Sequence, residues 1–192
     1  MKKAHYNDRD VIIDILTQSF QTNKSVNYIV QQDDKKIERI KALMDYSFEI
    51  CYNYGEVFLS DDDKACALIL YPDQKNTSLK TILLDIKLIL NSVGVMNIKK
   101  ALRRESMIKN IQPKVPMYYL WFIGVRPEDQ GAGIGTKFIN EILEHSKEKG
   151  RPVYLETSTL KNIPWYKRFS FEIYSELDLG YKLFFLKRAS NF

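Results

Sequence analysis

Apolar residues in the first third of the chain recur at the spacing of helices. In residues 11–20 and 37–51 they follow one another at intervals of three and four positions, which predicts two amphipathic helices. Asn7 and Asp10 are residue types that cap a helix N-terminus, and Gly55 is suited to end the second helix.

The pattern then changes to strands and back to helices. Residues 56–60 and 65–71 flank an acidic turn and predict a β-hairpin. Residues 79–93 carry an apolar stripe with helical spacing that breaks at Gly94, and a second helix rich in Lys and Arg is expected to begin near Ile98. We call residues 79–114 the basic helical pair.

The second half of the chain alternates strands and helices. Residues 118–125 are apolar or aromatic throughout, except for one glycine, which predicts a central strand that is covered on both faces. The other expected elements are a helix at 133–149, a strand at 152–158, a short helix at 165–169 and an antiparallel pair of strands at 171–175 and 181–187. Together they predict one mixed α/β sheet with helices on both faces.

Composition and charge narrow the class of protein. A chain of 192 residues with 45% hydrophobic residues is expected to form a single globular domain, 1–192. The net charge is +5, and the basic helical pair alone holds 8 basic and 2 acidic residues, a net of +6. Such a segment usually forms a solvated face, and its cations are not interleaved with aromatic residues, so we expect no nucleic-acid partner.

The cysteines and histidines indicate a protein with reduced thiols and no bound metal, and the N-terminal residues indicate no signal peptide. Cys51 and Cys66 belong to no metal-ligand cluster, and we interpret them as core residues with reduced thiols. His5 and His145 are expected to be solvated. The basic start of the chain is not followed by the apolar stretch of a signal peptide, and no apolar run reaches the length of a membrane span. We therefore expect a cytoplasmic protein with no membrane partner.

A glycine-rich turn joins the predicted central strand to the helix that follows it. Gly131, Gly133 and Gly135 would let ligand oxygens approach the backbone, and the free N–H groups of the first helical turn favour an anion such as a phosphate. The spacing is neither the dinucleotide fingerprint nor a P-loop. On the turn alone, a glycine segment that only lets the helix and strand pack together remains an equal alternative.

Two motifs in order carry a family resemblance. Gln130, Gly133 and Gly135 match the Q/R-x-x-G-x-G/A signature of the GNAT superfamily of acyl-CoA-dependent N-acyltransferases, after a strand that ends in an apolar-Gly-Val segment. The sequences LETS at 155–158 and NIPWYKRF at 162–169 resemble the branch that includes puromycin-type acetyltransferases. The resemblance covers residues 118–171, which we take as the cofactor-binding motif.

The resemblance implies a fold and a cofactor site. The fold would be a mostly antiparallel mixed sheet whose central strands splay apart, with acetyl-CoA as the cosubstrate in the opening. The backbone of Ile123, Gly124 and Val125 would bind the pantetheine arm. Main-chain N–H groups would cradle the pyrophosphate, and Asn162 would be a further contact. The residues of the pyrophosphate cradle would be Gln130, Gly131, Ala132, Gly133, Ile134, Gly135 and Thr136.

The same resemblance suggests catalytic groups. Tyr166 is the candidate general acid that would protonate the departing CoA thiolate. Glu156, a carboxylate in an apolar strand, is the candidate base for the amine, since burial would raise its pKa. Two alternatives stay open: Glu156 is a structural acceptor for the backbone or for Arg151, or water takes the proton.

The function that follows is an acetyltransferase without a metal. It would transfer an acetyl group from acetyl-CoA to a primary amine of a small molecule by direct attack in a ternary complex, as a monomer or a homodimer. Residues 20–32 and the basic helical pair would build the acceptor pocket, the latter as a lid. The alternative is a GNAT-fold module that binds or senses acyl-CoA and has lost catalysis.

The sequence departs from the family pattern at two positions. Ser170 stands where a glycine is usual, so we expect a changed turn before the next strand. Met117 stands where many relatives of this type have His, so any role of that His in handling the substrate is vacant here.

Overall fold

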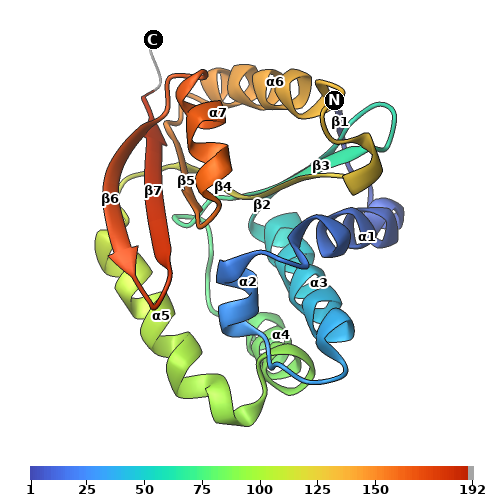
Figure 1. Ribbon diagram of the computed structural model, residues 1–192, viewed down its shortest axis with the longest axis vertical. Coiled ribbons are helices and arrows are strands. Elements are labelled where there is room, and N and C mark those ends of the chain that lie inside the picture. Colours follow the sequence, from blue (N-terminus) through green and yellow to red (C-terminus); the bar gives the residue numbers. More distant parts are fainter. Residues whose placement is uncertain (190–192) are drawn as a thin grey trace.

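The computed structural model describes residues 1–189, and it is built around one seven-stranded sheet in the order β1-β2-β3-β4-β5-β7-β6 (Figure 1). All neighbouring strands are antiparallel except β4 and β5, which are parallel. The predicted mixed and mostly antiparallel α/β fold is confirmed. The strands are β1 (Lys2–Lys3), β2 (Gly55–Leu59), β3 (Ala65–Leu70), β4 (Tyr118–Val125), β5 (Val153–Thr157), β6 (Glu172–Asp178) and β7 (Lys182–Arg188).

Helices cover both faces of the sheet, as the apolar pattern predicted. Two long helices, α1 and α3, lie on one face, and α6 and α7 lie on the other (Figure 1). The apolar pattern did not predict β1 or the short helix α2, which Asn23 caps by accepting a hydrogen bond from the Val26 N–H at 3.1 Å. The helices are α1 (Arg9–Phe20), α2 (Lys24–Ile29), α3 (Lys36–Tyr54), α4 (Leu79–Leu88), α5 (Ile98–Ile111), α6 (Ile134–Glu148) and α7 (Ile163–Lys167).

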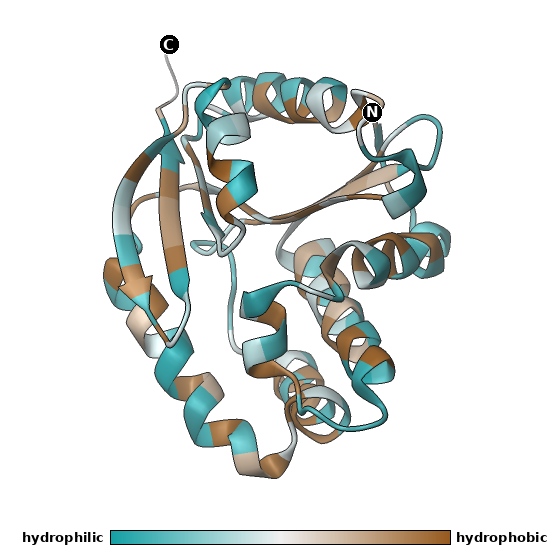
Figure 2. Ribbon diagram, viewed as in Figure 1, coloured by the Kyte–Doolittle hydropathy of each residue, from teal (hydrophilic) through white to brown (hydrophobic). Residues whose placement is uncertain are grey.

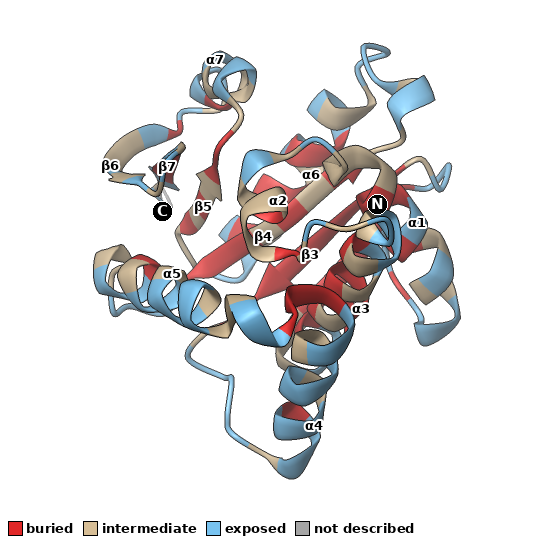
Figure 3. Cartoon of the chain, turned by 60° about the horizontal axis from the view of Figure 1, so that its bottom comes forward, coloured by how far each residue is buried: buried red, intermediate tan, exposed pale blue. Residues whose placement is uncertain are grey.

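The core consists of two apolar layers separated by the sheet. The layer under α1 and α3 includes Leu16 and Phe48, and the layer under α6 includes Phe138, all with at most 1% of their surface exposed. Figure 3 shows β3 and β4 as the buried centre, and Figure 2 shows the apolar side of α6 turned toward the sheet. Cys51 and Cys66 are fully buried in the first layer, which confirms that they are core residues, and burial raises the pKa of both thiols.

The predicted break in the basic helical pair is confirmed. α4 continues into a π-helical turn, Ile89–Val93, and the chain reverses at Gly94, whose φ of 74° is the left-handed conformation that glycine favours. The parts on either side of Gly94 are bent by 104° relative to each other. Among residues 1–189, no single helix is both long enough and apolar enough to cross a membrane.

The expectation that His145 is solvated is wrong. Its side chain lies on the sheet side of α6, where a hydrogen bond of 3.0 Å joins Nδ1 to the Tyr118 hydroxyl, and Nε2 lies 3.5 Å from a carboxylate oxygen of Glu56. Burial lowers the pKa of His145, although the Glu56 charge opposes this shift. The helical periodicity identified the apolar side of α6 but not this polar position at its margin.

Ser170 occupies the turn between α7 and β6 with a φ of 61°, a conformation that costs an L-residue about 1–2 kcal/mol relative to its ordinary region. Ser170 therefore adopts the backbone conformation that glycine favours, and its side chain does not change the turn. Replacing Ser170 with Gly should raise the free energy of unfolding by about 0.5–1 kcal/mol, measured by chemical denaturation. Ser170→Ala is the control because it keeps the Cβ atom, and an equal gain in that variant would contradict the explanation.

Candidate functional site

The two central strands are paired over a very short length. Hydrogen-bonded pairing between β4 and β5 is limited to Tyr118 with Val153 and Tyr119 with Tyr154. Beyond these positions the strands spread apart (Figure 1). The rest of β4 is bonded to β3 on one side and, among residues 1–189, has no strand on the other, so its backbone there is open to a ligand.

A bulge in β4 lies at the start of this opening. Leu68 of β3 pairs with Phe122, and Ile69 pairs with Leu120, so Trp121 is an extra residue on β4. Such a bulge bends a strand and increases its local twist, which is a physical reason for β4 to leave β5. Ile123, Gly124 and Val125 lie beyond the bulge, at the end of the open edge.

Gly124 lets α1 approach β4 closely. A Cβ atom at this position would lie 3.0 Å from Ser19 Oγ and 3.1 Å from Leu16 Cδ2, both on α1. The Ser19 hydroxyl also donates a hydrogen bond to the Val125 carbonyl oxygen at 2.9 Å. α1 is therefore fixed against the strand end that leads into the glycine turn.

The glycine turn presents a continuous series of free backbone donors. Within the described part of the chain, none of the N–H groups of residues 131–136 donates a hydrogen bond to another residue. The series ends where the Lys137 N–H bonds to the Gly133 carbonyl oxygen at 3.0 Å, the first bond of α6. These donors and the positive end of the 15-residue helix α6 favour an anion.

Gln130 shapes the turn rather than joining the free donors. Its N–H bonds to the Pro127 carbonyl oxygen at 3.3 Å, and its side-chain amide donates to the Val125 carbonyl oxygen at 3.1 Å. Both contacts hold the start of the turn against the end of β4.

The glycines of the turn serve two different purposes. Gly131 and Gly133 have φ values of 88° and 82°, and a Cβ atom at either position would have no atom within 4 Å. Packing against the protein therefore does not require these two glycines. Their positive φ favours glycine, and the open space beside them leaves room for a ligand. Gly135 is different, because a Cβ atom there would lie 3.4 Å from Val125 Cγ2 and 3.8 Å from Trp165 Cζ2.

The second motif lies against the first. The Trp165 indole N–H of α7 donates to the Thr136 hydroxyl on α6 at 3.3 Å. Asn162 is the last residue of the 3-10 turn Leu160–Asn162 and immediately precedes α7. The structure thus brings the two segments that carry the family resemblance into contact.

Tyr166 is a largely buried residue whose hydroxyl oxygen is not sealed from solvent. Its ring packs against Trp165 and Phe171, with centroid distances of 4.8 Å and 5.4 Å, and only 5% of the residue is exposed. Its hydroxyl forms no hydrogen bond with any residue that the structure describes. Burial raises the pKa of Tyr166 well above its usual value of 10, so the phenol holds its proton at neutral pH.

Glu156 lies near the end of β5 and accepts hydrogen bonds from two side chains. The donors are the Tyr119 hydroxyl of β4 and the Gln112 amide, the latter at 2.8 Å. Burial raises the pKa of the Glu156 carboxyl, although both bonds oppose this shift. Arg151 instead forms two hydrogen bonds to Asp73, at 2.7 Å and 2.9 Å, so the predicted Arg151 partner is wrong.

Polar contacts that the sequence analysis missed connect the end of β5 to α2 and α5. The Ser25 N–H of α2 donates to Ser158 Oγ at 3.3 Å, and Arg104 of α5 donates to Ser25 Oγ at 2.6 Å. Together with Gln112, which follows α5, these contacts make the basic helical pair a neighbour of Glu156. No spacing in the sequence signals them, because each partner comes from a different element.

No group of three or more His, Cys, Asp or Glu side chains within residues 1–189 is arranged to hold a metal ion.

Comparison with known proteins supports the family resemblance. Residues 92–171 match the acetyltransferase (GNAT) family. Fifty-four residues are 41% identical to an uncharacterised N-acetyltransferase of Schizosaccharomyces pombe, which is 28% of this chain and 22% of that protein. The matched stretch therefore spans about a fifth of the curated relative. Nothing in these matches singles out the puromycin-type branch.

Solved structures of similar fold cover nearly the whole chain. The histone acetyltransferase HPA2 and related acetyltransferase of Corynebacterium glutamicum superimposes with a TM-score of 0.73 at 17% identity, over 98% of this chain and 94% of that one. Arylalkylamine N-acetyltransferase 2 of Aedes aegypti gives a TM-score of 0.63 at 17% identity, over 99% and 98%. At these identities the likeness concerns the fold.

Two buried carboxylates should respond to pH in opposite directions. Glu156 has a pKa above 4.5, so the folded state keeps its proton longer and stability falls as pH rises from about 4.5 through the raised pKa. Burial also raises the pKa of Glu56, but the Tyr71 hydroxyl and the charges of His145 and Lys149 outweigh this, so its pKa is lowered and its contribution is lost on acidification.

Glu156→Gln should therefore reduce the fall in unfolding free energy between pH 4.5 and neutral pH. Glu56→Gln, the matched control, should lower stability most at neutral pH and least in acid. Denaturant titrations across this pH range measure both effects. The same pH profile in Glu156→Gln and the wild type would contradict the assigned shift.

Proposed function

We propose that the chain transfers an acetyl group from acetyl-CoA to a primary amine of a small molecule. The match of residues 92–171 to the acetyltransferase (GNAT) family supports this proposal. The observation that carries the proposal is the run of free N–H groups at residues 131–136, beside the open edge of β4. A pyrophosphate and an amide-containing arm are the chemical groups that such a pair of features accommodates.

The residues fit acetyl-CoA as the cosubstrate. The N–H groups of residues 131–136 would bind the pyrophosphate, and the backbone of Ile123 to Val125 would bind the pantetheine amides. Asn162, immediately before α7, would be a further contact. Acetyl-CoA supplies the acetyl group as a thioester.

Tyr166 and Glu156 would handle the two protons of the reaction. The amine nitrogen attacks the thioester carbonyl carbon, a C–N bond forms and the C–S bond breaks. Glu156 would accept the proton that the amine loses, directly or through water, and Tyr166 would donate a proton to the leaving sulfur. The raised pKa of Glu156 brings the carboxyl closer to the range in which it can accept a proton near neutral pH, and the raised pKa of Tyr166 keeps the phenol protonated.

A direct transfer in a ternary complex agrees with the state of the cysteines. A covalent acyl-enzyme requires an accessible thiolate, but Cys51 and Cys66 have no exposed surface. Burial also raises the pKa of both thiols.

The acceptor would bind between α2, α5 and the end of β5. Lys100 of α5 lies 3.9 Å from the centre of the Tyr28 ring of α2, and Arg104 and Gln112 reach Ser25 and Glu156. These contacts support the basic helical pair as a cover for the acceptor. The name of the Aedes aegypti protein, an arylalkylamine N-acetyltransferase, adds support for an amine acceptor.

Gly133 and Gly180 offer a matched test of the cofactor site. Both have a φ of 82° and open space around a Cβ atom, but only Gly133 lies in the glycine turn. We expect Gly133→Ala to weaken acetyl-CoA binding at least about tenfold, because the methyl group would enter the space of the anion, whereas Gly180→Ala keeps wild-type affinity. Both variants should lose similar stability, since both strain the backbone equally.

Calorimetric titration with acetyl-CoA measures this effect, with NAD and ATP as comparison ligands at the same ionic strength. The wild type should bind acetyl-CoA selectively. Equal binding of all three ligands would mean a generic anion site, and equal affinity in the two alanine variants would remove the turn from the cofactor site.

Tyr166→Phe should separate catalysis from binding. Removal of the phenolic proton donor should lower turnover by a factor on the order of 10²–10⁴ and leave acetyl-CoA affinity nearly unchanged. CoA release with a panel of small primary amines measures turnover, and calorimetry measures affinity. Tyr118→Phe is the control, because that hydroxyl is also on a buried tyrosine but is bonded to His145, in the last turn of α6.

Unaltered turnover in Tyr166→Phe would end its assignment as the acid. Selective acetyl-CoA binding without CoA release for any amine would favour the module that only binds acyl-CoA.

A further inference from the structure

Helix α4 turns its apolar side to solvent. Five of its apolar positions, or those of the π-helical turn that continues it, are at least 45% exposed. They recur at helical spacing and therefore form one stripe. The stripe consists of Leu79, Ile82, Leu83, Ile86 and Leu90.

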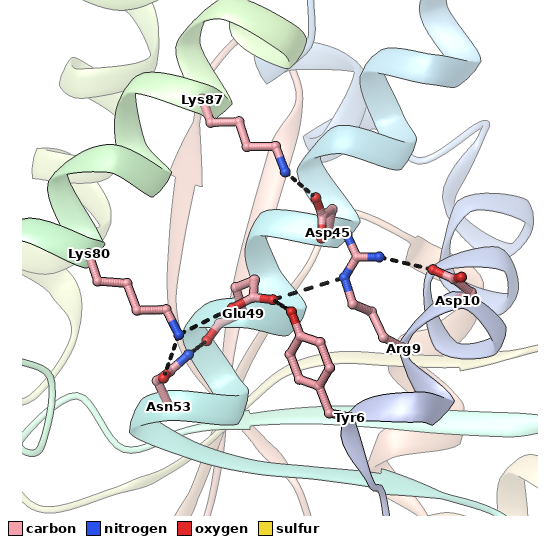
Figure 4. A network of polar contacts seen from close by, with 8 residues as sticks. All are labelled: Tyr6, Arg9, Asp10, Asp45, Glu49, Asn53, Lys80 and Lys87. Carbon is pink, nitrogen blue, oxygen red and sulfur yellow. Dashed lines mark hydrogen bonds and ion pairs between the residues drawn. The ribbon is translucent and has the colours of Figure 1, made fainter.

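On its inner side α4 packs Leu84 and Leu88 against the core, and polar contacts to α3 flank them (Figure 4). Lys80 donates to Asn53 Oδ1 at 3.0 Å, and Lys87 pairs with Asp45 at 2.9 Å. On the same side of α4, Asp85 accepts a hydrogen bond from the Tyr46 hydroxyl at 2.7 Å. The charged side of the helix is thereby held against the domain, and the outward stripe carries no charge.

The stripe leads to a protruding tip between α4 and α5. Val95 and Met96 follow the reversal at Gly94 and are 64% and 92% exposed. In Figure 1 this turn lies at the lower end of the molecule's longest axis. Exposed apolar patches of this kind usually mark an interaction surface.

Cations border the tip. Residues 86–104 contain five basic and no acidic residues. Lys99 and Arg103 are exposed and form no ion pair with any residue that the structure describes, and Lys100, which is also exposed, lies over the Tyr28 ring. An apolar surface bordered by free cations is complementary to the headgroup region of an anionic bilayer.

We propose that the α4–α5 tip docks on the surface of an anionic lipid bilayer. Leu90, Val95 and Met96 enter the boundary between headgroups and acyl chains, and the cations of α5 meet the lipid phosphates. This binding differs from the expectation of no membrane partner, but it requires no membrane span. It goes beyond the proposed acetyl transfer and does not depend on it.

Charge and polarity favour a bilayer over two other occupants. A second copy of the chain joined at the tip would bring its own cations against Lys99, Lys100 and Arg103, and the like charges would repel. A nucleic acid would satisfy these cations but would leave Val95 and Met96 without an apolar partner.

Sedimentation with lipid vesicles tests the proposal on the full chain. We expect binding to vesicles of equal parts phosphatidylcholine and phosphatidylglycerol and much weaker binding to phosphatidylcholine alone. Lys99→Gln with Arg103→Gln should weaken binding on the order of 30-fold. Val95→Ser with Met96→Ser should weaken it on the order of tenfold.

Matched variants control for charge and for fold. Lys147→Gln with Lys187→Gln removes the same charge from exposed positions on α6 and β7, and Val115→Ser replaces an exposed apolar residue elsewhere. Both controls should bind like the wild type. Circular dichroism should show unchanged folding in every variant, which is expected because all the replaced side chains are exposed.

Three results would overturn the proposal. One is no binding of the wild type to the anionic vesicles. Another is binding that depends on the cations but not on Val95 and Met96, which would be simple electrostatic adsorption. A third is a dimer in light scattering that the Val95→Ser and Met96→Ser changes dissociate, without vesicle binding, because a second copy would then be the occupant.

Discussion

The two-position pairing of β4 with β5 is the constraint on which the candidate site depends. Once the bulge at Trp121 bends β4 away, the strand keeps one bonded edge and exposes the other. The same separation leaves the end of β5, with Glu156, away from the end of β4. The glycine turn and α7 then approach each other through Trp165 and Thr136. One local irregularity thus produces an open backbone edge, a cradle of donors and a space between them.

Different interactions fix the two sides of this opening. On the side of the glycine turn the contacts are mainly to the backbone, since Ser19 and Gln130 both donate to the Val125 carbonyl oxygen. Glu156 is instead held by the side chains of Tyr119 and Gln112. Backbone donors depend little on side-chain identity, whereas a buried carboxylate depends on each of its partners. The glycine turn is therefore recognisable as a sequence motif, whereas the surroundings of Glu156 are not.

The sequence predicted most helices and strands because their apolar positions face one of the two apolar layers of the core. It did not predict α2, a short helix set by the Asn23 cap and by contacts to β5, and it mistook His145 for a solvated residue. Periodicity reports which positions are apolar, but partners from distant elements decide where polar side chains go. The motif residues of the turn and of α7 were identifiable from the sequence. Gln112 and Arg104 were not, since only the fold brings them near β5.

The orientation of α4 is the clearest case in which apolar spacing alone does not predict which side of a helix is buried. The stripe from Leu79 to Leu90 has the spacing of a core-facing helix, and periodicity alone would turn it inward. In the structure Leu84 and Leu88 of α4 pack against the core instead, and Lys80 and Lys87 on the flank of the helix find acceptors on α3. Exposed pairs of this kind contribute about 0–1 kcal/mol each, less than burial of several leucine and isoleucine side chains would contribute. The outward stripe therefore leaves apolar surface in contact with water. Covering this surface with another apolar surface would lower the free energy of the protein.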